Sequence, residues 1–175
     1  MEKEILFSRE EIHEKVVSLG KMIEKDFEDD FVVISLLRGS FIFAADLVRE
    51  IERLVEIDFL TTSSYGHSES SSGEVRFLTD LRTNIEGRNV LIVDDILDTG
   101  NTLYAVKEKL MTYKPKSLKT CVLLDKPSRR EADVSADYVG FEIEDLFIVG
   151  YGLNYGDHYR NIPYIYTYKE KNEKL

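Results

Sequence analysis

The segment that carries most information on the architecture runs from residue 90 to residue 102 and reads VLIVDDILDTGNT. Its apolar start ends in two adjacent carboxylates, Asp94 and Asp95. A third carboxylate, Asp98, precedes the small polar run at residues 99–102, and a helix-like segment follows. This order is typical of a buried strand whose carboxyl end carries the ligand-binding groups of an open α/β sheet. It indicates a ligand with sugar hydroxyls and a phosphate.

Strand-like and helix-like patterns alternate on both sides of this segment. A capping-box spacing at Ser8 predicts a helix from there to about Phe27, because apolar residues recur at helical intervals. Further helices are expected at residues 41–51 and 103–113, and strands at residues 31–37, 55–62, 75–78, 89–93, 118–124, 138–143, 146–151 and 163–167. The alternation predicts an α/β fold with a mostly parallel sheet between helices.

One internal segment, residues 63–74, is rich in Ser, Gly and Glu and cannot build a core. We expect it to be a mobile loop within one domain that spans residues 1–175, because no linker or repeat is visible.

Composition limits the classes of protein that remain. The chain has 175 residues with a net charge of −10, which argues against non-specific binding of nucleic acid. Its one cysteine, Cys121, cannot form an internal disulfide, so a reducing cytoplasm fits best. The first residues lack the apolar stretch of a signal peptide, and no run approaches the length of a membrane span.

The paired acids Asp94 and Asp95 indicate a ligand site only if the strand ends there. Successive residues of a strand point to opposite faces, so both acids can face one ligand where the chain turns. We therefore expect the central strand to end at Val93. Paired carboxylates suit ribose hydroxyls or a Mg²⁺ ion carried by a polyphosphate. Acids that merely face water at a strand end are the alternative.

Three neighbouring features suit a phosphorylated sugar. The turn at residues 99–102 offers free amides at a helix start, where one phosphate fits, although Thr99 or Thr102 could equally be a plain N-cap. Asp98 could exchange a proton with a heterocyclic base, or simply be an acid at a helix start. Arg38 and Gly39 end an apolar strand and suggest a polyanion site or a simple turn.

Other well-known sites are not supported. The chain lacks the Gly-x-x-x-x-Gly-Lys-Ser/Thr loop of nucleoside triphosphatases, a Gly-x-Gly-x-x-Gly after a strand, and a Gly-x-Ser-x-Gly elbow. The three histidines have no spacing typical of zinc ligands.

Residues 90–102 resemble the phosphoribosyl-pyrophosphate motif of type I phosphoribosyltransferases. Further segments are similar to those of the hypoxanthine-guanine phosphoribosyltransferases and occur in the family's order over nearly the whole chain. They are LLRGS at residues 36–40, SSYG at 63–66, LLDK at 123–126, FIVGYG at 147–152 and YR at 159–160. The resemblance implies the fold of that family, with a small hood formed by the chain ends, and a flexible catalytic loop at about residues 63–75.

The resemblance also implies an activity: transfer of the phosphoribosyl group to N9 of hypoxanthine, and of guanine, with Mg²⁺ as cofactor. It implies a homo-oligomer, either dimer or tetramer. The sugar and its metal would be held by Asp94 and Asp95, the 5′-phosphate by Thr99, Gly100, Asn101 and Thr102, and pyrophosphate by Arg38, Gly39 and Arg160. Asp98 would be the general base or acid at purine N7. The purine would be read by Lys126, Phe147 and Ile148, under a lid that includes Ser64 and Tyr65.

One position departs from the family pattern. Asn154 stands where the family usually has an aspartate associated with a second Mg²⁺ ion, and Asn keeps an oxygen ligand but loses the charge. Two other functions stay open: a nucleotide-sensing, RNA-binding regulator on the same fold, and a xanthine-preferring transferase. Asp98 and the net charge of −10 disfavour the regulator.

Overall fold

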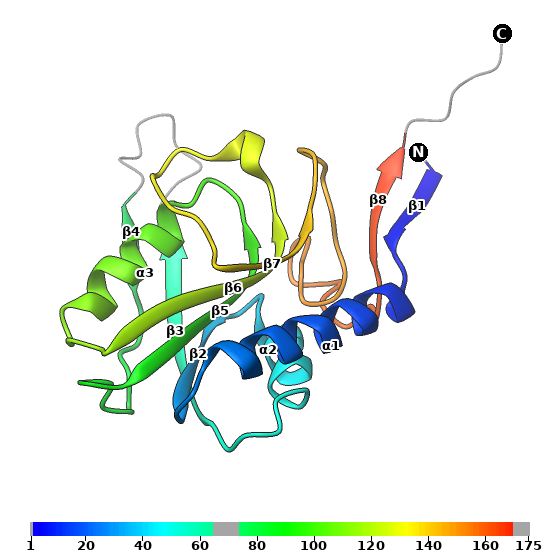
Figure 1. Ribbon diagram of the computed structural model, residues 1–175. Helices are drawn as coiled ribbons and strands as arrows, with labels where there is room; N and C mark the ends of the chain where they lie inside the picture. Colours follow the sequence, from blue (N-terminus) through cyan, green and yellow to red (C-terminus); the bar gives the residue numbers. More distant parts are fainter. Residues whose placement is uncertain (1, 65–73, 170–175) are drawn as a thin grey trace, which may run out of the picture.

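The structure is a computed structural model that describes residues 2–64 and 74–169 (Figure 1). In chain order its elements are β1 (Glu2–Phe7), α1 (Arg9–Asp26), β2 (Phe31–Leu37), α2 (Phe41–Val48), β3 (Glu56–Ser64), β4 (Val75–Phe77), β5 (Asn89–Leu97), α3 (Asn101–Met111), β6 (Ser117–Asp125), a 3₁₀ turn (Pro127–Arg129), β7 (Tyr138–Glu142) and β8 (Ile165–Lys169).

Six strands form the central sheet in the order β4-β3-β2-β5-β6-β7. All neighbours are parallel except β3 and β4, which pair antiparallel at one edge. The carboxyl ends of β2, β5 and β6 therefore meet at one edge of the sheet, where an open α/β fold binds its ligands. The predicted fold class is confirmed.

Helices cover both faces of this sheet, as predicted (Figure 1). Helices α1 and α2 pack on one face, over Val33, Leu91 and Val93. Helix α3 packs on the other face, over Ile34, Ile92 and Val122. The apolar runs of β2 and β5 are buried on both faces for this reason, which is why they show no alternation.

A second, two-stranded sheet pairs the two ends of the described chain. β1 and β8 run antiparallel, with Glu4 opposite Thr167, and lie beside one another away from the main sheet (Figure 1). This pair is the expected hood. Its first strand is missing from the sequence-based assignment, because EKEILF has too many charges to show a strand pattern.

Several elements begin or end a few residues from their expected bounds, and two of the expected strands near the site need correction. The central strand β5 continues through both acids to Leu97 instead of ending at Val93, because Asp94, Ile96 and Leu97 keep their pairing with β6. Residues 146–151 do not form a strand. They contribute only isolated bridges, since positive φ values at Gly150 and Tyr151 break the extended conformation.

The capping signal at the start of the chain is confirmed by the structure. Ser8 and Glu11 form the reciprocal capping box of α1. Cys121 is fully buried in β6, where desolvation raises the pKa of its thiol. No helix among residues 2–64 and 74–169 is long and apolar enough to span a membrane.

Candidate active site

A cavity of about 290 Å³ opens at the carboxyl edge of the sheet. It lies between the ends of β2 and β5 and the start of α3. The predicted site residues that line it are Gly39, Asp94, Asp95, Asp98, Thr99, Gly100, Thr102, Asn154 and Arg160. The structure therefore brings together most of the predicted sugar-phosphate residues from three distant parts of the sequence.

Asp94 and Asp95 both reach this cavity although the strand does not end before them. Their carboxylates accept hydrogen bonds from the next amides in the chain, Asp95 N–H at 3.0 Å and Ile96 N–H at 2.9 Å. Burial raises the pKa of both carboxyls, and the charge of Asp95 raises that of Asp94 further. Arg160 opposes the rise at Asp95.

This pair of acids fits a cation. Within the described residues, no Lys or Arg lies within ion-pair distance of either carboxylate. The same residues contain no cluster of three or more His, Cys, Asp or Glu side chains that could hold a metal alone. Two desolvated carboxylate oxygen donors suit Mg²⁺ that keeps several other ligands from water or phosphate.

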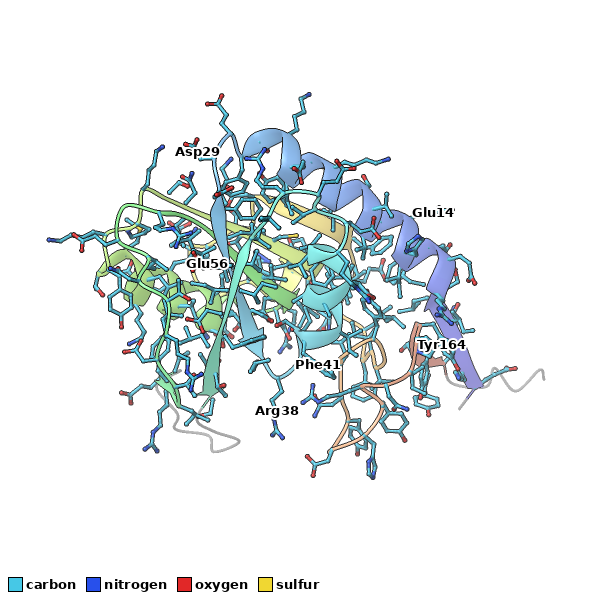
Figure 2. The ribbon with its side chains drawn as sticks, turned by 90° about the horizontal axis from the view of Figure 1, so that it is seen from below. Glu14, Asp29, Arg38, Phe41, Glu56 and Tyr164 are labelled. Carbon is cyan, nitrogen blue, oxygen red and sulfur yellow. The ribbon has the colours of Figure 1, made fainter. Side chains whose placement is uncertain are left out.

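The loop after β2 presses its backbone against the acids. A Cβ atom on Gly39 would lie 2.1 Å from Oδ2 of Asp95, so a larger residue there would force the Asp95 carboxylate to move. The peptide bond between Leu37 and Arg38 is cis. The Arg38 side chain is exposed and projects outward beyond the end of β2 (Figure 2), so it lies outside the cavity lining.

The phosphate-sized turn is built on Gly100, whose φ of 84° lies in the left-handed region. Gly100 is the N-cap of α3 and has no side chain to bond the first-turn amides, which suits an external anion. Neither threonine is the N-cap residue, because Thr102 lies inside the helix and Thr99 precedes Gly100. The Thr99 hydroxyl nevertheless accepts a hydrogen bond from Asn101 N–H at 3.3 Å. Thr99 is tied to the following loop by its carbonyl, which accepts from Glu131 N–H at 2.8 Å. The Asn101 side chain donates to Glu131 at 3.0 Å.

Asp98 stands at the boundary between this cavity and the residues predicted to read a base. Arg129 Nε donates to its carboxylate at 3.2 Å, and Arg130 Nε donates to its backbone carbonyl at 3.2 Å. The backbone N–H of Lys126 donates to Leu97 O at 2.9 Å, because β5 and β6 are in register up to this point. Asp98 and Lys126 therefore follow directly from two paired strand ends.

Lys126 is buried, with 7% of its surface exposed, and its ammonium is held in place. It donates to Leu146 O at 2.7 Å and lies 3.6 Å from Asp145. Since an ammonium has three hydrogens, one remains for a ligand carbonyl.

Phe147 and Ile148 follow Leu146 on an irregular segment. Ile148 is buried, whereas the Phe147 ring is 54% exposed and meets the edge of Tyr155 at 5.5 Å between ring centroids. Phe147, Ile148 and Lys126 do not line the 290 Å³ cavity. Phe147 instead borders an apolar hollow with Val149, Tyr155, Tyr159 and Tyr168.

Two of the remaining predicted residues, Asn154 and Arg160, line the cavity from the segment that follows β7. Arg160 Nη1 donates to Gly152 O at 2.6 Å, and a Cβ on Gly152 would lie 2.3 Å from Gly39 O, so this segment is packed against the loop after β2. Asn154 Nδ2 donates to Gly156 O at 2.5 Å. Ser64 is the last residue of β3, and Tyr65 lies outside the described residues.

The structure adds two charged residues, Arg129 and Asp145, that sequence reasoning missed. Arg129 Nη1 lies 3.6 Å from Asp145, in addition to its bond with Asp98. Nothing in the sequence pattern links Asp98 to a residue 31 positions later. The only available signal was that Arg129 closely follows the predicted purine-reading lysine.

Comparisons with known proteins identify the family of this chain. Residues 8–156 match the family model described as phosphoribosyl transferase domain. The hypoxanthine-guanine phosphoribosyltransferase of Bacillus subtilis is 49% identical over 164 residues, covering 93% of this chain and 91% of the relative. The hypoxanthine phosphoribosyltransferase of Escherichia coli is 48% identical over 165 residues, with 93% of each chain covered.

Solved structures agree with the sequence matches. The crystal structure of a Bacillus anthracis hypoxanthine-guanine phosphoribosyltransferase superposes with a TM-score of 0.90 at 50% identity, covering 95% of this chain and 98% of that one. The ternary substrates complex of a Trypanosoma cruzi hypoxanthine phosphoribosyltransferase mutant gives a TM-score of 0.88 at 44% identity, covering 96% and 95%. The cavity, the fold and these similarities lead to one conclusion: the chain belongs to the hypoxanthine-guanine phosphoribosyltransferase family.

Proposed function

We propose that this protein is a purine-salvage enzyme that transfers the 5-phosphoribosyl group of phosphoribosyl pyrophosphate to N9 of hypoxanthine and of guanine. The products are IMP or GMP and pyrophosphate. The observation that carries the proposal is the hydrogen bond of 2.9 Å between Lys126 N and Leu97 O. It supports the proposal because it joins Lys126, the lysine that we assign to the purine, to the residue directly before Asp98.

The sugar half of the reaction is assigned to the cavity. Asp94 and Asp95 bind the ribose hydroxyls, and the turn at residues 99–102 binds the 5′-phosphate at the start of α3. The same two carboxylates would hold Mg²⁺, which, when bound, neutralises charge on the pyrophosphate as it leaves. Arg160 adds a positive charge on the side of Asp95, and the loop at Arg38 and Gly39 offers the pyrophosphate further contacts.

The base half is assigned to Lys126, Phe147, Ile148 and Asp98. The free hydrogen of the Lys126 ammonium donates to the purine 6-oxo group, and adenine, whose 6-amino group presents hydrogens, is rejected. The exposed ring of Phe147 stacks on the base, and the Ile148 backbone reads the adjacent edge. The Asp98 carboxylate takes the proton from purine N7 as the N9 bond forms.

The transition state explains why these groups lie together. When the bond to pyrophosphate breaks before the bond to the purine is complete, positive charge develops on the sugar. Carboxylates near the ring stabilise that charge. Water would consume such a cation, so a cover is required. We assign this role to the loop at residues 63–75, with Ser64 and Tyr65 as its leading residues. Its central residues lie outside the described ranges.

The test is a panel of free bases. Hypoxanthine, guanine, xanthine, adenine and uracil are each incubated with phosphoribosyl pyrophosphate and Mg²⁺, and nucleotides are detected by chromatography. Hypoxanthine and guanine should be converted fastest, whereas adenine and uracil should give no nucleotide above background. Preferred conversion of xanthine would replace the proposed substrate by the alternative one. Absence of any nucleotide would overturn the proposal.

Two further properties belong to this proposal. We assign the protein to the cytoplasm, because its single cysteine is buried in the core and cannot form a disulfide, which fits a reducing compartment. We also propose a dimer or tetramer of this chain. Ile57 and Phe59 lie on one face of β3 and are 45% and 47% exposed. Exposed apolar side chains of this kind suit a contact between chains. Light scattering coupled to size-exclusion chromatography measures the number of chains.

A further inference from the structure

The carboxylate of Asp98 is oriented by a single side chain among the described residues, that of Arg129. Arg129 Nε lies 3.2 Å from Asp98 Oδ1, whereas Arg130 contacts only the Asp98 backbone. A contact to one oxygen leaves the other free to face a ligand. The orientation of the proposed proton acceptor therefore depends on where Arg129 stands.

Arg129 is itself held between two acids. Its Nη1 atom lies 3.6 Å from Asp145 Oδ2, and the other oxygen of Asp145 lies 3.6 Å from Lys126 Nζ. Asp98, Arg129, Asp145 and Lys126 thus form a row of alternating charges, which we call the ion-pair row. It links the group assigned to purine N7 with the group assigned to the purine 6-oxo oxygen.

The backbone supports this row. Arg129 ends the 3₁₀ turn that begins directly after Lys126, and its amide donates to Lys126 O at 3.1 Å. Arg130 also binds Asp125 through its side chain and Val134 O at 3.3 Å, which fixes the exit of the turn. The Arg129 side chain is therefore anchored at its base while its guanidinium remains 48% exposed at the rim.

We propose that Arg129 is a positioning residue that holds the Asp98 carboxylate in place for proton exchange at N7. Through Asp145, Arg129 also fixes the position of that carboxylate relative to the Lys126 ammonium. This inference rests on the proposed function, since it assigns Asp98 and Lys126 to a purine. Arg129 does not touch the reacting atoms. A planar guanidinium with a fixed fork suits the role, because it can face two carboxylates at once.

The arrangement predicts a separation of kinetic constants. Arg129→Gln should lower kcat for hypoxanthine about tenfold, because the loss of one of two interacting side chains commonly has an effect of this size. KM for phosphoribosyl pyrophosphate should stay within about twofold, because Arg129 lies outside the cavity lining. Arg129→Lys keeps the charge but loses the fork, and kcat should recover in part.

A double-mutant cycle with Asp98→Asn is the decisive test. If Arg129 acts through the Asp98 carboxylate, Arg129→Gln should change kcat by less than about twofold in the Asp98→Asn background. The same loss in both backgrounds, or a wild-type-like kcat for Arg129→Gln alone, would overturn the inference. The cycle run with Arg129→Lys decides the matter if the Gln variant is unstable.

A matched control is the pair of Arg88 and Glu56, joined at 2.9 Å with Arg88 31% exposed. Arg88→Gln removes a comparable surface ion pair far from the cavity and should leave kcat unchanged. Wild-type turnover of the base panel is measured alongside. A wild type without nucleotide product refutes the proposed function, whereas an active wild type with an uncoupled Arg129 refutes only this inference.

Discussion

The proposed sugar-binding half of the site and its proposed base-binding half, hereafter the sugar half and the base half, differ in how much of the fold holds them. Asp94 and Asp95 lie within β5, which has a paired strand on each side, and Gly39 packs directly against Asp95. Phe147 lies on an irregular segment, is 54% exposed and meets the edge of the Tyr155 ring, which is itself 64% exposed.

This difference predicts that the two halves respond differently to substitution. The sugar half is fixed by sheet register and close backbone packing, so it should tolerate almost no added volume. The base half depends on a few side-chain contacts, such as that of Lys126 with Leu146 O. Single substitutions there should alter selectivity while the fold stays intact.

The largest effect is expected at the boundary between the halves. Asp98→Asn keeps the size of the side chain but removes the proposed proton acceptor, so kcat should fall by about 10²–10⁴-fold. KM for phosphoribosyl pyrophosphate should change by less than about threefold, because the carboxylate acts in the chemical step. Steady-state kinetics with both substrates measures this separation. An equal loss in kcat and in affinity for phosphoribosyl pyrophosphate would make Asp98 structural.

Added volume tests the sugar half. Gly39→Ala places a Cβ 2.1 Å from Asp95 Oδ2, so the carboxylate must move. Overpacking costs about 1–3 kcal/mol, and returning the displaced carboxylate to its place on binding would make phosphoribosyl pyrophosphate bind roughly 5- to 150-fold more weakly. Isothermal titration calorimetry measures the loss.

Gly87→Ala is the control for this substitution. Gly87 has a φ of 68° and nothing within 4 Å of a Cβ, so alanine there strains only the backbone. It should lower stability and leave the affinity for phosphoribosyl pyrophosphate unchanged. Equal affinities of wild type and Gly39→Ala for phosphoribosyl pyrophosphate would show that the loop after β2 can shift to accommodate a Cβ atom.

Selectivity tests the base half. Lys126→Ala removes the charged donor that we assign to the purine 6-oxo group, and a contact of this kind is worth about 1.5–3 kcal/mol. The ratio of kcat/KM for hypoxanthine over adenine should therefore fall by roughly 10- to 150-fold. The melting temperature of the variant serves as its folding control. Unaltered selectivity in a folded variant would remove Lys126 from base reading.

The acid pair predicts a pH dependence of stability. Burial raises the pKa of Asp94 and Asp95, so the folded protein keeps protons that the unfolded chain releases near pH 4. The free energy of unfolding contributed by this pair therefore falls as pH rises from about 4 through the raised pKa values. Asp94→Asn should relieve this loss.

Thermal melts of the ligand-free protein between about pH 4 and about pH 8 measure this pH dependence of stability. The melting temperature of Asp94→Asn should exceed that of wild type at the upper end, by about 2–4 °C for each kcal/mol relieved. At the lower end the two should converge. A variant less stable than wild type at high pH would show that the pair is satisfied in the free protein.

The smallest effect concerns the rim. Asn154 borders the cavity but is exposed, so a charge there is screened. Asn154→Asp should lower the Mg²⁺ concentration for half-maximal rate by about two- to fivefold, equivalent to an exposed ion pair of up to about 1 kcal/mol. Mg²⁺ titration of the initial rate measures it. An unchanged Mg²⁺ dependence would exclude metal binding through this position.

The parts of the fold predictable from sequence are those with short-range patterns. The apolar run of β2 and the helical spacing after Ser8 identify their elements without further information. The length of β5 was not predictable from alternation, because its pairing with β6 carries the strand past Asp94 and Asp95. β1 exists only through its partner β8, a relation between opposite ends of the chain.

The site shows the same division. The cavity acids and the phosphate turn occupy one continuous segment, and the sequence therefore indicates them directly. Arg129 and Asp145 come into contact with each other, and Arg129 with Asp98, only when β5 and β6 pair and the turn after Lys126 folds back. Gly39 is recognisable as a turn residue, but the closeness of Asp95 to it follows from tertiary packing alone.

The burial of Cys121 has a practical consequence for spectroscopy. Its thiol is enclosed in β6, and its raised pKa disfavours the thiolate that alkylating reagents require. A cysteine introduced at an exposed position such as Leu54 would therefore be the chain's one readily labelled sulfur. Fluorophores or spin labels can be attached at chosen points without first removing the native residue.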